Sequence, residues 1–386
     1  MKMKSISLKK VIMSLKYLLA LVVAKKDKRD IWLISERPTQ ARDNGYCFFK
    51  YMRCQYPKKE VYYLIDKKAD DYNKIKQYGN VIQFDSWKHY LYYCKSKIHI
   101  SAHVNGCCPN DAIGISRRTK RILNFKDVFI PHGVSYGISE FCLKKYTDIN
   151  LYICSGKPEY ENIIENYGYS EDEVAYTGFP RLDNWKDKKV DYKLIVLMPT
   201  WRAYIAQNSS VYFMDTQYFI HYQELLNDDE LSDFLESNDI KLIFYLHNEM
   251  RKYVNYFKTN NKNIQIAYDD REYDIQNLLK TAALLITDYS SVHFDFAYMN
   301  KPVIYYQFDQ KEFYQKQYEN SFFSAERNGF GPVAYEKKEV VDEIKKSLKL
   351  NFQMEPQFYN KMREFYRIYD DKNCERVYQA IEERLS

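Results

Sequence analysis

Short apolar runs recur along this chain, and polar or helix-forming stretches separate them. In the first half they lie at 31–35, 61–65, 81–84, 98–101, 128–130 and 151–154, and in the second half at 194–198, 241–246, 264–267, 284–286 and 302–306. Segments with helical character, such as 48–56, 219–226, 340–348 and 357–385, alternate with them. Strands that alternate with helices are typical of parallel sheets with crossover helices. The pattern predicts an α/β fold with two successive sheets.

The interval at 184–192 is charged and lacks apolar periodicity, so we expect a hinge there. A chain of 386 residues is too long for one ordinary core, which favours two domains. We expect a first domain at 30–185 and a second at 193–350. The segment 351–386 reads as helical and could pack back on the first domain.

Residues 1–29 differ in character from the rest of the chain. Between Leu8 and Ala24, large apolar residues recur at helical spacing while Lys9, Lys10 and Lys16 occupy other positions. The run falls short of the roughly 20 apolar residues that a spanning helix needs. We therefore expect a basic amphipathic helix that lies on the cytoplasmic face of an anionic membrane, so that the protein is peripheral. The alternative is that this helix docks on the protein's own core.

Composition narrows the range of partners. The formal charge of +6 fits an anionic substrate or membrane surface, but no concentrated basic stripe indicates a nucleic-acid partner. The eight cysteines form no Cys-x-x-Cys pair, which argues against a zinc site and favours reduced thiols. The acidic pairs Asp269-Asp270 and Asp370-Asp371 read as solvated turns. We therefore predict no metal site and no cofactor, and metal dependence stays open.

A hydroxyl-rich turn follows the buried run at 284–286. Thr287, Asp288, Tyr289, Ser290 and Ser291 lead from this predicted strand into a predicted helix. Backbone N–H groups and the positive end of a helix dipole converge at such a turn, so the turn predicts a phosphate-binding site. The alternative is that Asp288 or Ser290 simply caps the helix.

Polar residues also follow three other predicted strands. His132 and Gly133 follow 128–130, Arg202 follows 194–198, and His247 follows 241–246. Ligands in open α/β sheets bind beyond the carboxyl ends of strands. His132 suits a general base, and Gly133 leaves room for a substrate. Arg202 and Arg181 carry planar guanidinium groups whose N–H donors suit phosphate oxygens.

Together these motifs resemble the CDP-glycerol glycerophosphotransferases of teichoic acid synthesis. The blocks that carry the resemblance are Ser35-Glu36, Asp43-Asn44, His132-Gly133, Thr177 to Asp183, Pro199 to Arg202, His247, Thr287 to Asp295, Lys301-Pro302 and Gly329 to Val333. The resemblance implies a GT-B-like enzyme with two Rossmann-like domains facing a central cleft. It also implies in-line transfer of glycerol phosphate from CDP-glycerol to a hydroxyl of a lipid-linked polyol-phosphate or saccharide acceptor, with release of CMP.

The resemblance also implies residue roles. His132 would be the base, and His247, Arg202, Ser290 and Ser291 would hold the diphosphate, with Arg181 on the hinge side. We assign Asp288 to orienting the loop or a histidine, because a carboxylate does not favourably touch phosphate. Asn248 stands where the family commonly has proline, which leaves acceptor preference open.

Three alternatives remain. CDP-ribitol could replace CDP-glycerol as donor, since no feature of the sequence indicates the length of the polyol. A GT-B glycosyltransferase using a nucleotide sugar would share the two-domain architecture. A membrane-bound scaffold without activity would not need His132, Arg202 and Ser290 to converge. The sequence does not determine the acceptor, the number of units added or the oligomeric state.

Overall fold

The computed structural model describes residues 8–26, 29–109, 120–183, 185, 189–206, 210–268, 273–317 and 321–385. The chain divides into two compact units. The first contains residues 1–132, 139–183 and 370–386, and the second contains residues 133–138 and 184–369. Parts of the expected hinge at 184–192 and of the basic segment at 1–29 lie outside the described residues.

The first unit is built on a seven-stranded parallel sheet in the order β3-β2-β1-β4-β5-β6-β7. Its strands are β1 (Ile31–Ser35), β2 (Glu60–Ile65), β3 (Val81–Gln83), β4 (Ile98–Ser101), β5 (Lys126–Phe129), β6 (Leu151–Cys154) and β7 (Val174–Tyr176). Its α-helices are α1 (Leu8–Lys26), α2 (Asn44–Gln55), α3 (Tyr72–Lys76), α4 (Trp87–Lys95), α6 (Lys157–Tyr167) and α16 (Asn373–Leu385). Short 3-10 turns are η2 (Glu140–Cys142), η3 (Lys144–Tyr146), η4 (Glu171–Glu173) and η5 (Pro180–Leu182).

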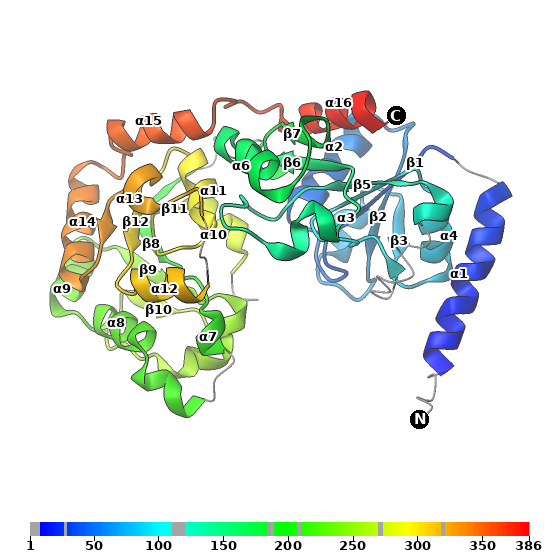
Figure 1. Ribbon diagram of the computed structural model, residues 1–386. Coiled ribbons are helices and arrows are strands. Elements are labelled where there is room, and N and C mark those ends of the chain that lie inside the picture. Colours follow the sequence, from blue (N-terminus) through cyan, green and yellow to red (C-terminus); the bar gives the residue numbers. More distant parts are fainter. Residues whose placement is uncertain are drawn as a thin grey trace. The chain divides into compact units, whose positions relative to one another are not determined.

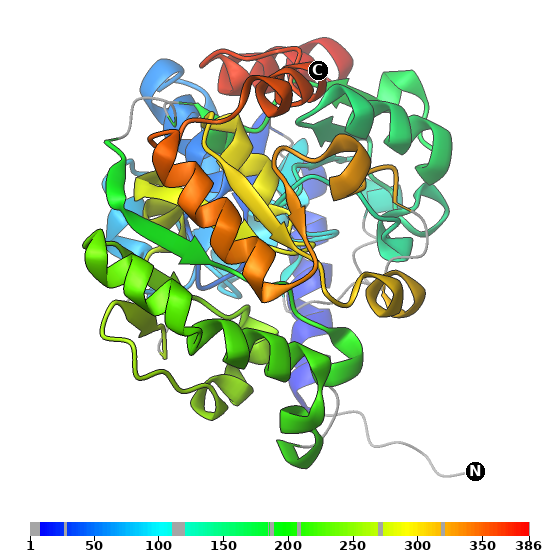
Figure 2. The same ribbon diagram turned by 90° about the vertical axis from the view of Figure 1, so that its left-hand side faces the viewer.

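The second unit is built on a six-stranded parallel sheet in the order β10-β9-β8-β11-β12-β13. Its strands are β8 (Asp191–Leu197), β9 (Lys241–Phe244), β10 (Ile264–Ile266), β11 (Ala282–Thr287), β12 (Val303–Tyr306) and β13 (Val333–Ala334). Its helices are α7 (Ala203–Ala206), η6 (Ser210–Asp215), α8 (Gln217–Leu226), α9 (Asp229–Ser237), η7 (Asn248–Tyr256), α10 (Ile275–Thr281), α11 (Val292–Tyr298), α12 (Gln310–Lys316), α13 (Ala325–Asn328), α14 (Lys337–Lys349) and α15 (Pro356–Phe365). Figure 2 shows α14 and α8 covering one face of this sheet.

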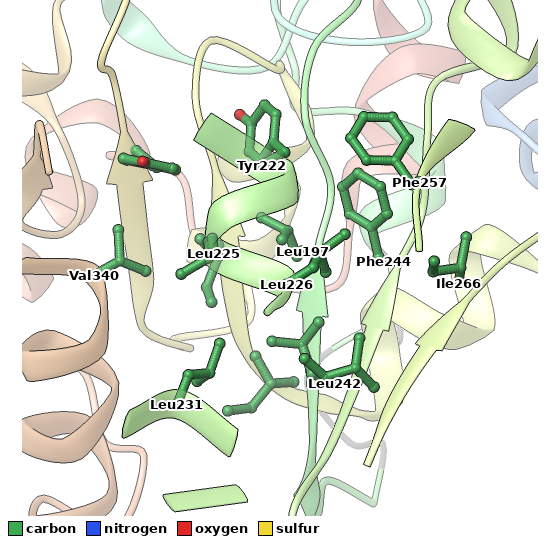
Figure 3. Packing of buried hydrophobic residues seen from close by; sticks show 14 of the residues in the cluster. Leu197, Tyr222, Leu225, Leu226, Leu231, Leu242, Phe244, Phe257, Ile266 and Val340 are labelled. Carbon is green, nitrogen blue, oxygen red and sulfur yellow. The ribbon is translucent and has the colours of Figure 1, made fainter. Parts of the chain in front are cut away.

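Both faces of the second sheet are buried. On β8, Leu197 packs in one hydrophobic cluster and Val196 in another, because successive side chains point to opposite faces of a strand. Leu242 and Phe244 of β9 face Leu226 of α8 and its neighbours (Figure 3). Burial on both faces explains why these strands read as continuous apolar runs rather than as alternating ones.

The closing segment and two short strands depart from the expectations. The closing segment 357–385 is not one helix but two, α15 and α16, and these belong to different units. Helix α15 ends at Phe365, after which the buried Tyr366 donates a hydrogen bond to the carbonyl oxygen of Phe294. The short strands β7 and β13 were not predicted, since neither sequence has a long apolar run.

Helix α1 docks on the first unit with one face only. It lies beside α4 (Figure 1), and Tyr17, Ala20 and Ala24 are buried in the hydrophobic cluster beneath it. The opposite face presents large aliphatic side chains to solvent, with Leu18 and Leu19 each 59% exposed. The docking on the protein's own core, considered as an alternative, therefore accounts for Tyr17, Ala20 and Ala24 but leaves Leu18 and Leu19 uncovered.

All eight cysteines are free thiols in this structure. Cys107 and Cys108 are buried, and Cys108 Sγ lies 3.1 Å from the hydroxyl of Tyr17. The adjacent pair thus packs in the core.

Candidate functional site

In the first unit, three neighbouring strands deliver polar side chains to one edge of the sheet. Strands β1, β4 and β5 are adjacent and parallel, so their carboxyl ends meet. Glu36 follows β1, His103 follows β4 and His132 follows β5. This edge is where ligands of doubly wound sheets bind.

His132 is held by Asp43. Its Nδ1 lies 2.5 Å from Oδ2 of Asp43, and the His132 side chain is 42% exposed, so the ring is open to solvent. The other carboxylate oxygen of Asp43 accepts a hydrogen bond from Nη1 of Arg181 at 3.0 Å. Burial opposes ionisation of Asp43, but Arg181 and His132 together hold the pKa of this carboxyl below its ordinary value. An ionised carboxylate can only accept hydrogen bonds. A neutral His132 ring bonded to Asp43 therefore carries its proton on Nδ1 and its lone pair on Nε2.

Arg181 helps to hold Asp43 in place and does not present a free guanidinium group to a phosphate. Its side chain is 3% exposed and its guanidinium pairs with Asp43. The amide oxygen of Asn44 accepts from the backbone N–H of Arg181 at 3.1 Å, and the amide nitrogen of Asn44 donates to the carbonyl oxygen of Pro131 at 2.7 Å. Asn44 therefore ties the segment that carries Arg181 to the segment that carries His132.

Glu36 fixes the turn that presents Asp43. One of its carboxyl oxygens accepts from the backbone N–H groups of Asp43 and Tyr46, and the other accepts from that of Arg42. Burial, and then the charge of Asp43, raise the pKa of Glu36 to about 7. The Glu36 carboxyl is thus a structural support of the site whose charge changes near neutral pH.

His103 was not among the predicted site residues. Its Nε2 lies 2.9 Å from Nε2 of His132, and the ring centroids are 4.3 Å apart. The signal was present, because His103 follows the predicted strand at 98–101 just as His132 follows its own strand. Asp43 was noticed only as part of a family motif, since no local pattern indicates a contact with a residue 89 positions away.

In the second unit, Asp288 at the end of β11 organises two loops. One carboxylate oxygen accepts from the backbone N–H groups of Thr200 and Tyr289, and the other accepts from the hydroxyl of Tyr222. That second oxygen also lies 2.9 Å from Nη2 of Arg202. Asp288 thus contacts the loop after β8 and its own loop, and this contact pattern suits a loop-orienting role.

Arg202 is placed differently from the prediction that it holds a diphosphate. Its side chain is 0% exposed. Nε and Nη2 donate to the two carboxylate oxygens of Asp309 at 2.7 and 3.0 Å, and Nη1 donates to the carbonyl oxygen of Thr200 at 2.8 Å. Burial opposes its charge, but Asp288 and Asp309 raise the pKa of Arg202 well above its ordinary value. The guanidinium is already neutralised by two carboxylates and presents no open face to a ligand.

The serine turn lies at the start of α11. Ser290 and Ser291 are half-buried, and α11 has seven residues. Gly133 packs against this turn within the second unit, because a Cβ at Gly133 would lie 2.8 Å from Oγ of Ser291. The next part of the segment 133–138 is also fixed there, since the hydroxyl of Tyr136 donates to the carbonyl oxygen of Tyr289. Any side chain at position 133 would require the Ser291 hydroxyl to shift.

His247 is the N-cap residue directly before η7, and it is exposed. Its Nδ1 accepts from the backbone N–H of Glu249 at 3.3 Å, so a neutral ring carries its proton on Nε2. The ring lies parallel to Trp201 with centroids 6.1 Å apart. Four residues further on, the guanidinium nitrogens of Arg251 are shielded from solvent and have no hydrogen-bond partner within the described chain. Sequence reasoning missed Arg251, since a lone arginine after a strand carries no specific signal.

Within the described ranges, no three histidine, cysteine or acidic side chains gather as metal ligands would. Asp370, from one of the acidic pairs, forms an ion pair with Arg376 at 2.8 Å. The other pair, Asp269-Asp270, lies outside the described residues.

Known structures share this fold. A variant of the wall teichoic acid polymerase TagF superposes with a TM-score of 0.68 at 15% identity, covering 99% of this chain and 100% of that chain. A putative UDP-N-acetylglucosamine 2-epimerase from Listeria monocytogenes gives a TM-score of 0.57 at 13% identity, covering 92% of this chain and 96% of the other. The two parallel-sheet units therefore have a GT-B-like fold.

Sequence comparison gives the family. The minor teichoic acid biosynthesis protein GgaB of Bacillus subtilis (strain 168) is 32% identical over 366 residues, which cover 92% of this chain and 40% of that protein. The teichoic acid glycerol-phosphate primase of the same organism is 29% identical over 182 residues, which cover 43% of this chain and 42% of the primase. The matched region thus spans about two fifths of each of these relatives. Residues 15–383 match the family described as CDP-Glycerol:Poly(glycerophosphate) glycerophosphotransferase, and the chain therefore belongs to that family of transferases in teichoic acid synthesis.

Proposed function

We propose that this protein transfers glycerol phosphate from CDP-glycerol to a hydroxyl group of a lipid-linked acceptor and releases CMP. The observation that carries the proposal is the Asp43–His132 pair, which leaves the lone pair of a neutral, partly exposed His132 ring on Nε2. Family membership supplies the donor class. A TagF variant has been studied in a CDPG soak, and that structure has a TM-score of 0.65 to this chain.

The reaction is a displacement at the glycerol-linked phosphorus. The acceptor oxygen bonds to that phosphorus as its proton passes to Nε2 of His132, and the bond from phosphorus to the CMP oxygen breaks. Asp43 favours this transfer because its negative charge stabilises the imidazolium that forms. Proton removal by a positioned base contributes about 10²- to 10⁴-fold to a rate.

The donor diphosphate needs hydrogen-bond donors and positive charge, because charge develops on the departing CMP. We assign this role to the hydroxyls of Ser290 and Ser291, to Nε2–H of His247 and to the guanidinium of Arg251. A shielded guanidinium without an anion is costly, so Arg251 suits a phosphate oxygen. We assign Arg181, Arg202 and Asp288 to positioning, because each is held by other protein groups.

Gly133 joins the proposed base to the second unit along the chain, and the second unit carries the residues proposed to hold the diphosphate. It follows His132 directly, and within the second unit it packs against Ser291. A side chain at Gly133 would require the Ser291 hydroxyl to shift. We therefore assign Gly133 to substrate approach, because the absence of a side chain there leaves the Ser291 hydroxyl in place.

We further propose that the exposed face of α1 lies in the surface of an anionic membrane on its cytoplasmic side. Leu15, Leu18, Leu19 and Val22 are 54–60% exposed on this helix. Lysines flank the stretch in the sequence and suit anionic headgroups. No helix among the described residues is long and apolar enough to span a bilayer.

The test is to supply the purified full-length chain with CDP-glycerol, CDP-ribitol and a nucleotide sugar in turn, each with a lipid-linked acceptor, and to measure the free nucleotide. We expect release of CMP from CDP-glycerol. CDP-ribitol is the second candidate, because a teichoic acid poly(ribitol-phosphate) polymerase of Bacillus spizizenii is 28% identical over 263 residues. Release only from the nucleotide sugar would favour a glycosyltransferase. Release from none of the three donors would favour a scaffold.

A further inference from the structure

Two imidazole rings face each other in the first unit. Nε2 of His103 lies 2.9 Å from Nε2 of His132, and the ring planes are inclined by 63°. A nitrogen–nitrogen hydrogen bond at this distance contains one proton. Two opposed lone pairs, or two opposed N–H groups, would repel each other. One ring must donate and the other accept.

The direction of this bond follows from Asp43. Nδ1 of His132 donates to Asp43, so the neutral His132 ring accepts at Nε2. His103 must then carry its proton on Nε2 and donate it. Burial is the main cause that lowers the pKa of His103 to about 4. Repulsion from Arg37, and from His132 whenever that ring is protonated, adds to this effect, and Asp43 opposes it. At neutral pH His103 is therefore an uncharged ring with a single N–H.

The turn that carries His103 is tightly built. Its backbone N–H donates to Oγ of Ser101 at 3.1 Å, and its carbonyl oxygen accepts from the N–H of Gly106 at 2.9 Å. A Cβ at Gly106 would lie 2.0 Å from Oγ of Ser101, so only glycine fits there. These contacts hold the backbone of the turn, and the His103 ring itself is half-buried.

We propose that His103 determines selectivity for an acceptor hydroxyl over water by occupying the lone pair of His132 until an acceptor displaces it. The proposal rests on the proposed function, in which His132 is the base. Water could attack the same phosphorus. Its oxygen would bond to phosphorus, the bond to CMP would break and one water proton would pass to His132, giving glycerol phosphate and CMP. A bound acceptor can replace one neutral hydrogen bond because its other contacts hold it in place, whereas a single water molecule has no such contacts.

The test compares two rates for the full-length protein. CMP release from CDP-glycerol is measured without acceptor, which reports hydrolysis, and with a lipid-linked acceptor, which reports transfer. We expect His103→Ala to raise the ratio of hydrolysis to transfer about tenfold. Loss of one neutral hydrogen bond changes the fraction of His132 lone pairs that are occupied by about this factor. His103→Asn retains a donor and should stay near the wild-type ratio. His221→Ala, on α8 of the second unit, is a matched histidine control and should not change it.

An unchanged ratio in His103→Ala would overturn the proposal, as would the same rise in His103→Asn. A second measurement does not depend on activity or on variants. Nitrogen-15 NMR of the histidine-labelled wild-type protein should show His132 protonated on Nδ1 and His103 protonated on Nε2, and a His103 protonated on Nδ1 would overturn the proposal. If the wild type releases no CMP from CDP-glycerol with any acceptor, the proposed function fails, and the NMR experiment still decides how the two rings are bonded.

Discussion

Oδ2 of Asp43 lies 2.5 Å from Nδ1 of His132, although 89 residues separate the two in sequence. The same carboxylate binds Arg181, so one aspartate orients the candidate base and is itself oriented by a buried cation. This arrangement makes the role of Asp43 testable apart from that of His132.

Replacing Asp43 with asparagine should lower kcat by about 10²- to 10⁴-fold, because the neutral amide neither fixes the His132 tautomer nor stabilises an imidazolium. Steady-state release of CMP measures the effect. Asp71→Asn is the matched control, since Asp71 pairs with Arg42 at 2.8 Å in the same unit and is not bonded to His132. Equal losses in the two variants would show that loss of a carboxylate–arginine pair, and not orientation of the base, is responsible.

Replacing His132 with alanine should lower turnover by about 10²- to 10⁴-fold, the usual contribution of a positioned base. The fold should persist, because the His132 side chain is 42% exposed. Circular dichroism checks the fold, and CMP release checks the rate. An unchanged rate would remove His132 from the mechanism.

Replacing Arg202 with glutamine should destabilise the second unit by about 3–5 kcal/mol, because Asp288 and Asp309 would be left buried without their cation. Urea-induced unfolding measures the change. Arg327→Gln, an exposed arginine in the same unit, is the control and should have little effect. If Arg202→Gln unfolds like the wild type and raises only the KM for CDP-glycerol, the donor-binding role expected from the sequence would be correct and the positioning role would not.

The raised pKa of Glu36 gives a pH dependence of stability. Its pKa is about 7 in the folded protein against an ordinary value of 4.5, so between these values the unfolded chain releases the proton that the folded chain retains. The contribution of Glu36 to the free energy of unfolding should therefore be fully present below about pH 4.5 and be lost as the pH rises to about 7. Urea unfolding of the wild type and of Glu36→Gln at several pH values measures it. The difference between the two should decline over this window, and a constant difference would contradict the assignment.

The proposed membrane binding of α1 is tested better by point substitutions than by a deletion. Deleting residues 1–29 would also uncover the core that Tyr17, Ala20 and Ala24 cover, so its effect would be ambiguous. We expect Leu18→Glu to reduce co-flotation with anionic vesicles, because a charge would enter the apolar face. Phe141→Glu adds the same charge at a position that is 74% exposed elsewhere in the first unit and should leave flotation unchanged. Equal flotation of Leu18→Glu and the wild type would refute the membrane role.

The sequence alone determined the alternation of strands and helices and the residues that follow the strands. Its apolar runs are continuous because the sheets are buried on both faces, as at Val196 and Leu197, and such runs can be read without any tertiary contact. His132, His247 and Asp288 were found because a polar residue at the end of a predicted strand is a local signal.

The tertiary structure decided what those residues touch. In the sequence, Arg202 and Arg181 both suit a phosphate ligand. In the structure, Arg202 pairs with Asp309 and Arg181 pairs with Asp43, and both carboxylates come from distant segments of the chain. Likewise, only the packing of α1 shows which of its apolar residues enter the core and which stay exposed. The physical reason is that a charge or an apolar side chain takes its role from its nearest partners, and in a parallel sheet those partners come from strands far apart in the chain.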